Sequence, residues 1–315
     1  SMTVQEAAKQ LSEIQSEISK VIIWQNDLVR DVLIASLAGG HVLLEWAPGL
    51  AKTKTIKTLA RILGTSFSRI QFTPDLLPSD VLGSEVYRQE TGVFEIRKGP
   101  IFANLVLADE INRAPSKVQS ALLQAMEEHQ VTIGDQTFEL DQPFTVLATQ
   151  NPIEQEWTYP LSEAQVDRFL MKIQVPYPDK QDEVEIMKTV TSDSRDTIHC
   201  VSMDDFQATI QTIESIHIDE KIYEYIAEII DHTRDLEATN RYILHGASPR
   251  ASIAFVRCAR VLAVMNGRDF VLPEDIKSLA KQILRHRIIR AYEAIGDEVS
   301  TDQIVERILQ AVKVP

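Results

Sequence analysis

The chain has 315 residues, a length that corresponds to about two domains of ordinary size. Hydrophobic residues make up 44% of it and charged residues 25%, which is typical of a globular protein and excludes disordered and fibrous classes. Acidic residues outnumber basic ones by 46 to 32, and the net charge of −14 argues against nucleic acid or an anionic membrane as a partner. Glycine is scarce, with 11 residues, and tryptophan occurs three times.

The cysteines and the most apolar stretch indicate the compartment. Cys200 and Cys258 lie in different segments and form neither a disulfide framework nor a C-x-x-C metal or redox motif. The most apolar stretch, 32–51, is interrupted by glycine, histidine, glutamate and proline, so it is no clean membrane span. We therefore expect a cytoplasmic protein without a membrane partner.

The first half of the chain predicts alternating strands and helices. Apolar residues at helical spacing predict two leading helices, and short apolar runs between turn signals predict buried strands. Alternation of this kind is typical of a parallel sheet with helices on both faces. The predicted helices are 4–18, 28–38, 53–63 and 116–128, and the predicted strands are 41–46, 66–72, 105–109, 144–149 and 171–175.

Two segments interrupt this alternation with hairpin patterning. The first, 84–97, turns around Glu90-Thr91-Gly92, and the second, 130–140, turns around Gly134-Asp135. We expect both hairpins to project from the edge of the sheet.

After Pro176-Tyr177-Pro178 the strand patterns stop, and the remaining chain predicts helices only. Ser248-Pro249 and Leu272-Pro273 are helix-start signals because proline suits the first helical turn. We therefore expect an α/β domain over 1–180 and an all-α domain over 181–315. The predicted helices of the second domain lie near 180–194, 203–214, 219–238, 249–266, 273–290 and 301–312.

The loop between the strand at 41–46 and the following helix has part of a phosphate-binding pattern. Its sequence is Trp46-Ala47-Pro48-Gly49-Leu50-Ala51-Lys52-Thr53, which has the Lys-Thr end of G-x-x-x-x-G-K-[ST] but neither terminal glycine. A loop that leads into a helix N-terminus points backbone N–H groups at an anion. Lys52 can then reach phosphate oxygens and Thr53 can ligate Mg²⁺. An ordinary turn with a solvated lysine fits this segment about equally well.

Two acids follow the apolar strand at 105–109. Asp109 can hold the metal shell, and Glu110 can polarise a water for attack on a γ-phosphate. Acids at the end of a strand are common, so this pair alone favours an ordinary strand-to-loop transition. Combined with Lys52 and Thr53, it supplies both halves of a Mg²⁺-nucleotide site at the carboxyl edge of one sheet.

Many ordered motifs stand between Val21 and about Arg290: Gly39-Gly40-His41-Val42-Leu43-Leu44-Glu45, Pro48-Gly49-Leu50-Ala51-Lys52-Thr53, Gln71-Phe72-Thr73-Pro74-Asp75-Leu76-Leu77-Pro78-Ser79-Asp80, Lys98-Gly99-Pro100-Ile101-Phe102, Ala108-Asp109-Glu110-Ile111-Asn112-Arg113-Ala114, Ala148-Thr149-Gln150-Asn151-Pro152, Glu163-Ala164-Gln165-Val166-Asp167-Arg168-Phe169 and Gly246-Ala247-Ser248-Pro249-Arg250-Ala251. Through these motifs the sequence resembles the MoxR family of AAA+ ATPases. The resemblance implies an AAA+ P-loop NTPase core with β-hairpin inserts, an all-α lid domain, and ATP with Mg²⁺ as cofactors.

The resemblance also implies roles for individual residues. Walker A and Walker B roles fall on Lys52, Thr53, Asp109 and Glu110, with Thr53 and Asp109 at the metal. The remaining residues implied to lie beside the nucleotide are Pro48, Gly49, Leu50, Ala51 and Lys54.

Three further residues resemble parts that sense or complete the site. Asn151 resembles sensor 1, whose amide helps to hold the attacking water, and Arg250 resembles sensor 2. Arg168 matches the arginine finger, which acts on the nucleotide of a neighbouring subunit. Arg113 is a weaker candidate for a contact across the same boundary.

An arginine finger supplied by a neighbouring subunit implies a ring, and we expect this ring to be a hexamer. The resemblance further implies a protein client, a partner with a von Willebrand factor A domain, and chaperone-like remodelling or maturation of protein complexes, including metal or cofactor insertion. The inserts at 80–99 and 129–143 would face the central opening of the ring.

All three tryptophans stand where the MoxR pattern has glycine. Trp24 lies near the adenine, Trp46 opens the phosphate loop, where glycine permits φ > 0, and Trp157 precedes the arginine finger. Three explanations compete: a remodelled but active site, weak or absent nucleotide binding, or a stop codon translated under the wrong genetic code, which the three codons would decide. A nucleotide-binding scaffold that does not hydrolyse ATP, or a subunit of another AAA+ machine such as a magnesium-chelatase-like complex, therefore stays an alternative.

Overall fold

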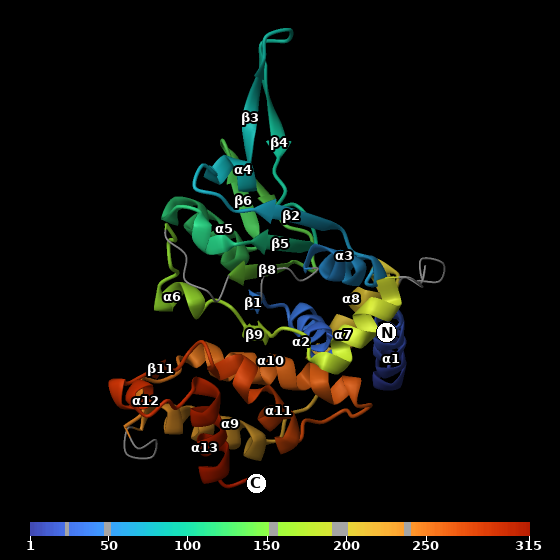
Figure 1. Ribbon diagram of the computed structural model, residues 1–315. Helices are drawn as coiled ribbons and strands as arrows, with labels where there is room; N and C mark the ends of the chain where they lie inside the picture. Colours follow the sequence, from blue (N-terminus) through green and yellow to red (C-terminus); the bar gives the residue numbers. More distant parts are fainter. Residues whose placement is uncertain (23–24, 47–51, 151–156, 191–200, 236–240) are drawn as a thin grey trace. The chain divides into compact units, whose positions relative to one another are not determined.

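The computed structural model describes residues 1–315 except 23–24, 47–51, 151–156, 191–200 and 236–240 (Figure 1). Its contacts define two compact units, and each is described by itself below. The core unit contains residues 14–165 and 173–203, and the lid unit contains residues 1–13, 166–172 and 204–315. These units are clusters of contacts, and a domain boundary between 180 and 181 stays a prediction.

A five-stranded sheet forms the centre of the core unit. Its order is β2-β5-β8-β1-β9, and β2, β5, β8 and β1 pair in parallel, which confirms the predicted sheet. Each strand lies within two residues of its predicted range. The strands are β1 (Val42–Trp46), β2 (Phe67–Gln71), β5 (Leu105–Asp109), β8 (Thr145–Gln150) and β9 (Met171–Val175).

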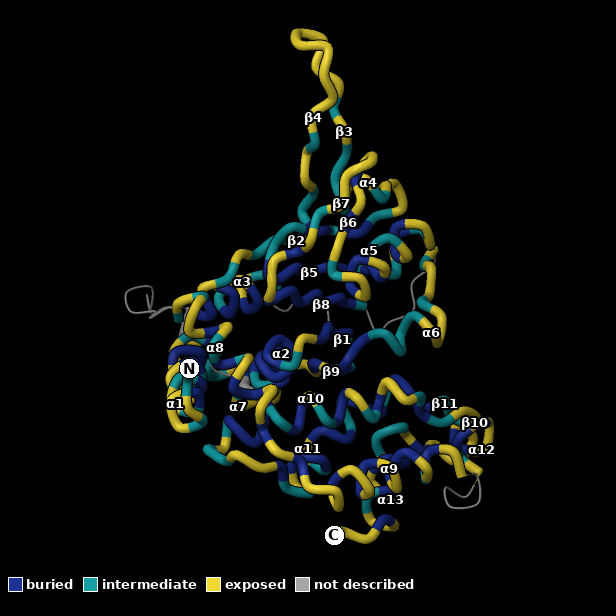
Figure 2. The backbone as a smooth tube through the Cα atoms, turned by 180° about the vertical axis from the view of Figure 1, so that it is seen from behind, coloured by how far each residue is buried: buried dark blue, intermediate teal, exposed yellow. Residues whose placement is uncertain are grey.

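The central strands are buried almost completely. Every residue of β5 is buried, as are five of the six residues of β8. Near-continuous apolar runs are typical of parallel strands that are covered on both faces. Figure 2 shows the same concentration of buried chain on β5, β8 and β1.

Amphipathic helices complete the core unit. On α3 the buried residues Ile56, Leu59 and Ala60 recur at helical spacing and form one apolar face. The helices are α1 (Val4–Val21), which begins in the lid unit, α2 (Asn26–Leu37), α3 (Lys52–Ile62), α4 (Pro78–Leu82), a 3₁₀ turn η1 (Ile111–Arg113), α5 (Ser116–Glu128), α6 (Glu163–Val166) and α7 (Lys180–Val190).

Both predicted hairpins are confirmed. β3 (Gly83–Arg88) pairs with β4 (Val93–Lys98), and β6 (Gln130–Ile133) pairs with β7 (Gln136–Glu139), each antiparallel. The β3–β4 hairpin extends away from the sheet (Figure 1).

The lid unit contains the predicted helices and one short helix, α12, that was not predicted. Ser248 caps α10 by accepting the backbone N–H of Arg250, and Pro249 occupies the first turn. The helices are α8 (Met203–Glu214), α9 (Glu220–Arg234), α10 (Pro249–Met265), α11 (Pro273–Leu284), α12 (Tyr292–Gly296) and α13 (Thr301–Ala311). None of the helices in the described part of the chain is long and apolar enough to cross a membrane.

The prediction of helices only was wrong at two places in the lid unit. The helix predicted over 273–290 ends at Leu284, and β11 (Ile289–Arg290) pairs antiparallel with β10 (Ile243–His245). The apolar pattern runs on beyond Leu284, but the side chains of Arg287 and its neighbours are hydrogen-bonded to carbonyl groups of distant segments, so tertiary contacts end the helix.

Candidate functional site

The predicted phosphate and acid residues meet at the carboxyl edge of the central strands. Lys52 and Thr53 begin α3, and Asp109 ends β5 and is followed by Glu110. The Lys52 Nζ donates to Asp109 Oδ1 at 3.1 Å, although 57 positions separate the two residues. The parallel order explains this meeting, because strands β1 and β5 end at the same edge of the sheet, on either side of β8.

The carboxylate of Asp109 is buried and held by three donors. Arg69, on β2, donates to Oδ2 at 2.8 Å, and the Thr149 hydroxyl donates to Oδ1 at 2.7 Å, beside the contact from Lys52. Burial raises the pKa of this carboxyl, but the hydrogen bonds from Thr149 and Arg69 and the charge of Lys52 outweigh burial and lower the pKa below its ordinary value. Asp109 is therefore ionised at neutral pH, as a metal ligand must be.

Thr149, near the end of β8, connects the two acids. Its hydroxyl donates to Asp109 and accepts the backbone N–H of Glu110 at 2.8 Å. One buried side chain thus fixes the direction of one acid and the backbone of the next.

Glu110 stands in an unusual backbone conformation. Its φ is 56°, in the left-handed region that residues other than glycine rarely adopt. Its carboxylate accepts from Nη1 of Arg113 at 3.2 Å, so the structure places Arg113 beside the predicted catalytic acid in the same chain. Such outliers cluster at functional sites, where surrounding contacts hold them. Here the N–H bond to Thr149 is one such contact.

Two of the three tryptophans fall in the described residues. Trp46 ends β1 with 1% of its surface exposed, and φ there is not positive, so the indole is accommodated as a buried strand residue. Its Nε1 is buried without a hydrogen-bond partner in the described structure. Trp157 is 86% exposed and has φ 68°.

Several predicted site residues are not tested by this geometry. Thr53 is partly exposed and Lys54 is exposed on the first turn of α3. The residues that lie outside the described structure are Trp24, Pro48, Gly49, Leu50, Ala51 and Asn151.

Two family models match separate parts of the chain, and known proteins match nearly all of it. A model of the ATPase family associated with various cellular activities (AAA) matches residues 41–171, and an AAA lid domain model matches residues 236–308. Chaperone MoxR1 of Mycobacterium tuberculosis is 43% identical over 304 residues, which cover 95% of this chain and 81% of that protein. The chain belongs to the MoxR family of AAA+ ATPases.

More distant and structural relatives agree with this assignment to the MoxR family. Protein MoxR of Methylorubrum extorquens is 28% identical over 333 residues, covering 96% of this chain and 93% of that protein. A crystal structure from Cytophaga hutchinsonii, of a protein assigned to the ATPases, has 49% identity and a TM-score of 0.89 and covers 98% of this chain and 96% of that one. The AAA+ core, the lid and an ATPase-type site are thus those of the MoxR family.

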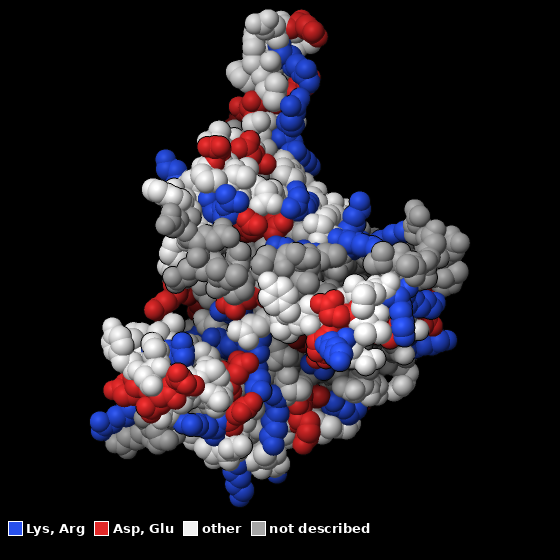
Figure 3. Space-filling view, in the orientation of Figure 1, with Lys and Arg blue, Asp and Glu red and all other residues white. Residues whose placement is uncertain are grey.

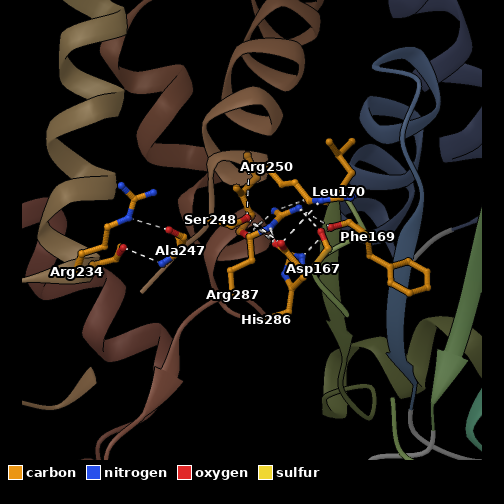
Figure 4. A network of polar contacts seen from close by, with 11 residues as sticks. Asp167, Phe169, Leu170, Arg234, Ala247, Ser248, Arg250, His286 and Arg287 are labelled. Carbon is orange, nitrogen blue, oxygen red and sulfur yellow. Dashed lines mark hydrogen bonds and ion pairs between the residues drawn. The ribbon is translucent and has the colours of Figure 1, made fainter. Parts of the chain in front are cut away.

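The remaining predicted residues, Arg168 and Arg250, both belong to the lid unit. Arg250, in the first turn of α10, lies 3.9 Å from a carboxylate oxygen of Asp167, the residue directly before Arg168 (Figure 4). The segment that starts α10 is closely packed, because a Cβ on Gly246 would lie 2.5 Å from the carbonyl oxygen of Thr233. The MoxR-type sequence at 246–251 therefore has a local structural reason for its glycine.

Sequence reasoning missed the partners that hold the predicted residues. Thr149 lies two residues before Asn151, inside the MoxR-like motif 148–152, so the sequence did offer a signal that Thr149 belongs to the site. The sequence offered no such signal for Arg69, because basic residues are common on half-exposed strands. Arg287 lies within the helix predicted over 273–290, and this prediction gave no indication of its distant partners.

Proposed function

We propose that this protein hydrolyses Mg²⁺-ATP and uses the reaction for chaperone-like remodelling or maturation of protein complexes, metal or cofactor insertion among them. The observation that carries the proposal is the cluster of Lys52, Asp109, Thr149 and Glu110 at one edge of the sheet. A lysine, an ionised aspartate and a second acid held in one place are the parts that phosphoryl transfer needs.

The donor set fits a magnesium ion bound with a nucleotide. The Thr53 hydroxyl and the Asp109 carboxylate are hard oxygen ligands, and Mg²⁺ in such sites is held by one or two protein oxygens, waters and phosphates. The ion supplies charge neutralisation on the phosphates. Lys52, now bonded to Asp109, would exchange that carboxylate for β- and γ-phosphate oxygens, and Pro48, Gly49, Leu50, Ala51 and Lys54 would offer further contacts.

Glu110 would orient and deprotonate the attacking water. Its carboxylate must leave Arg113 to do so, which costs little, because both side chains are partly exposed and such pairs contribute about 0–1 kcal/mol. Asn151 would hold the same water from the next strand end.

Completion of the site by a second subunit is part of the proposal. Arg168 would stabilise charge on the γ-phosphate of a neighbour, and Arg250 would sense the nucleotide of its own subunit. A trans-acting arginine requires a ring, for which we propose a hexamer.

The β3–β4 hairpin supports contact with a protein client. Tyr87 and Phe94 face each other with ring centres 5.2 Å apart, and they are 53% and 61% exposed. Figure 3 shows basic side chains along the same hairpin. Exposed aromatic residues on a projecting element are suited to binding unfolded or partly folded chains. A relative is named a chaperone, and we extend that role to this cytoplasmic protein, with a von Willebrand factor A domain protein as its partner.

The experiment measures binding of labelled ATP with Mg²⁺, phosphate release, and ring formation by sedimentation, on the parent and two variants. Lys52→Ala should abolish binding, because the phosphates lose their lysine. Lys57→Ala, at an exposed position five residues further along α3, is the matched control and should bind like the parent. Absence of ATP binding by the parent would overturn the proposal. Binding without phosphate release would instead support the scaffold alternative.

A further inference from the structure

The guanidinium of Arg287 uses all five of its N–H donors inside the lid unit (Figure 4). Nε donates to Asp167 Oδ1 at 2.8 Å, and Nη2 donates to the carbonyls of Asp167 and Phe169 at 3.0 and 2.7 Å. Nη1 donates to the carbonyls of Leu170 and Ile283 at 3.1 and 2.9 Å. Four of the five bonds therefore end on the short segment 167–170.

That segment carries Arg168, and its backbone is fixed on both sides of this residue. His286 adds a bond to the Phe169 carbonyl at 2.8 Å. Only 3% of the Arg287 side chain is exposed, so its bonds are shielded from water. Two adjacent residues after α11 thus hold the carbonyls that flank the predicted arginine finger.

The carboxylate of Asp167 connects the same group to the predicted nucleotide sensor. It accepts the Ser248 hydroxyl at 2.8 Å, and its Oδ2 lies 3.9 Å from Nε of Arg250. Ser248 is also the residue that caps α10, the helix on which Arg250 stands. One carboxylate is therefore shared by Arg287, by the cap of α10 and by Arg250.

A buried arginine with satisfied donors can also serve the fold alone. Two features of the lid unit favour a role in the reaction. The bonds of Arg287 concentrate on the one segment that bears Arg168. The charge of Arg287 also compensates Asp167, which without it would attract Arg250 more strongly.

We propose that Arg287 is a positioning residue for both arginines. It fixes the backbone around Arg168 so that this side chain is presented to a neighbouring subunit in one orientation, and it balances the charge of Asp167 so that this carboxylate attracts Arg250 less strongly. The proposal rests on the proposed function, in which Arg168 acts in trans.

Mixed rings test the trans action of Arg168 and its positioning by Arg287 separately. Glu110→Gln subunits retain Arg168 but lack the catalytic acid, whereas Arg168→Ala subunits retain the acid but lack the finger. Each alone should be inactive, and a mixture should recover phosphate release, because the first subunit offers its arginine to the second. Arg287→Lys is then placed either in the Glu110→Gln subunit, which donates the finger, or in the Arg168→Ala subunit, which receives it.

In the donor subunit, Arg287→Lys should lower the recovered activity by about 10- to 100-fold, since a misplacement of about 1 Å has that effect. In the receiving subunit the same change should lower it much less, because lysine keeps the charge that balances Asp167 and this subunit carries no Arg168 to be positioned. The matched control is Arg285→Lys, which alters another mostly buried guanidinium of the same turn, one that bonds Asp302 and the Lys172 carbonyl instead of 167–170. It should show no difference between donor and receiver. His286→Phe removes one bond to Phe169 and should give a smaller loss confined to the donor.

Hydrogen exchange on the nucleotide-free protein supplies a readout besides activity. Amides of residues 167–170 should exchange faster in Arg287→Lys, and their exchange should be unchanged in Arg285→Lys. Equal loss of activity from donor and receiver, in Arg287→Lys and in His286→Phe alike, would overturn the positioning role while leaving trans action of Arg168 intact. Failure of the parent mixture to recover any activity would overturn the trans action and the positioning role together.

Discussion

At the scale of single residues, the two described tryptophans differ in their effect on the stability of the fold. Trp46 fills the end of a central strand, where a large apolar side chain contributes to packing. Trp157 contributes little packing and holds a left-handed backbone that costs about 1–2 kcal/mol in residues other than glycine. The strain is thus at Trp157, although the sequence pattern pointed to Trp46 as the larger departure.

Trp157→Gly should therefore stabilise the protein by about 1 kcal/mol, because glycine adopts φ of 68° without a penalty. Trp157→Ala removes the same indole but keeps a Cβ, so it should give no gain of this size. Thermal or urea unfolding of both variants checks the difference. Equal stability of the glycine and alanine variants would contradict the account of strain.

A second prediction at this scale concerns Thr149. Thr149→Val keeps the shape but removes the bonds to Asp109 and to the backbone of Glu110. Phosphate release should fall by about 10- to 100-fold, which is typical when a residue that orients a ligand is lost. Thr149→Ser keeps the hydroxyl and should stay close to the parent. A valine variant as active as the parent would show that the acids need no such support.

At the scale of elements, the strands and helices could be predicted from the spacing of apolar residues, because burial determines this spacing in strands and in helices. β5 and α5 have their predicted bounds. The apolar run of β5 ends in acids, and α5 begins directly after Pro115 and ends before His129, which adopts a left-handed conformation. The site was predictable in part for the same reason: parallel strands bring their carboxyl ends to one edge. Arg69 and Arg287 were not predictable, because their partners come from distant segments and leave no periodic signal.

His41 connects two elements and makes stability depend on pH. Its Nδ1 accepts the backbone N–H of Val146 on β8, and Nε2 contacts the Met126 carbonyl on α5. Burial lowers the pKa of His41 to about 4. The unfolded chain, with the ordinary value near 6.5, binds the proton first, so folding is favoured fully above about 6.5 and less as pH falls to about 4.

The free energy of unfolding should therefore decrease by up to about 3 kcal/mol between pH 6.5 and 4 on account of His41. His286, whose pKa burial also lowers well below the ordinary value, acts in the same direction. His41→Gln retains a donor and an acceptor but does not titrate, so its unfolding free energy should depend less on pH. Urea unfolding at several pH values measures this, and an unchanged pH dependence in that variant would contradict the assignment.

At the scale of the whole molecule, the candidate nucleotide site belongs to the core unit, whereas Arg168 and Arg250 belong to the lid unit. The segment 166–172 clusters with the lid helices although it stands in the middle of the sequence. The backbone on both sides of Arg168 and the start of the helix that carries Arg250 are thereby held by one carboxylate, Asp167, and by one guanidinium, Arg287. This arrangement could be found only from the structure, because nothing in the order of the sequence relates 167 to 287.

The proposed hydrolysis of ATP depends on Glu110, which would activate the attacking water. Its most direct test is phosphate release from Mg²⁺-ATP by the parent and by Glu110→Gln, with ATP binding measured on the same samples. The account predicts that the parent releases phosphate and that the variant binds ATP equally well but is about 100-fold slower or more, the usual contribution of a general base. Phosphate release at the parental rate by the variant, or none by a parent that binds ATP, would contradict it.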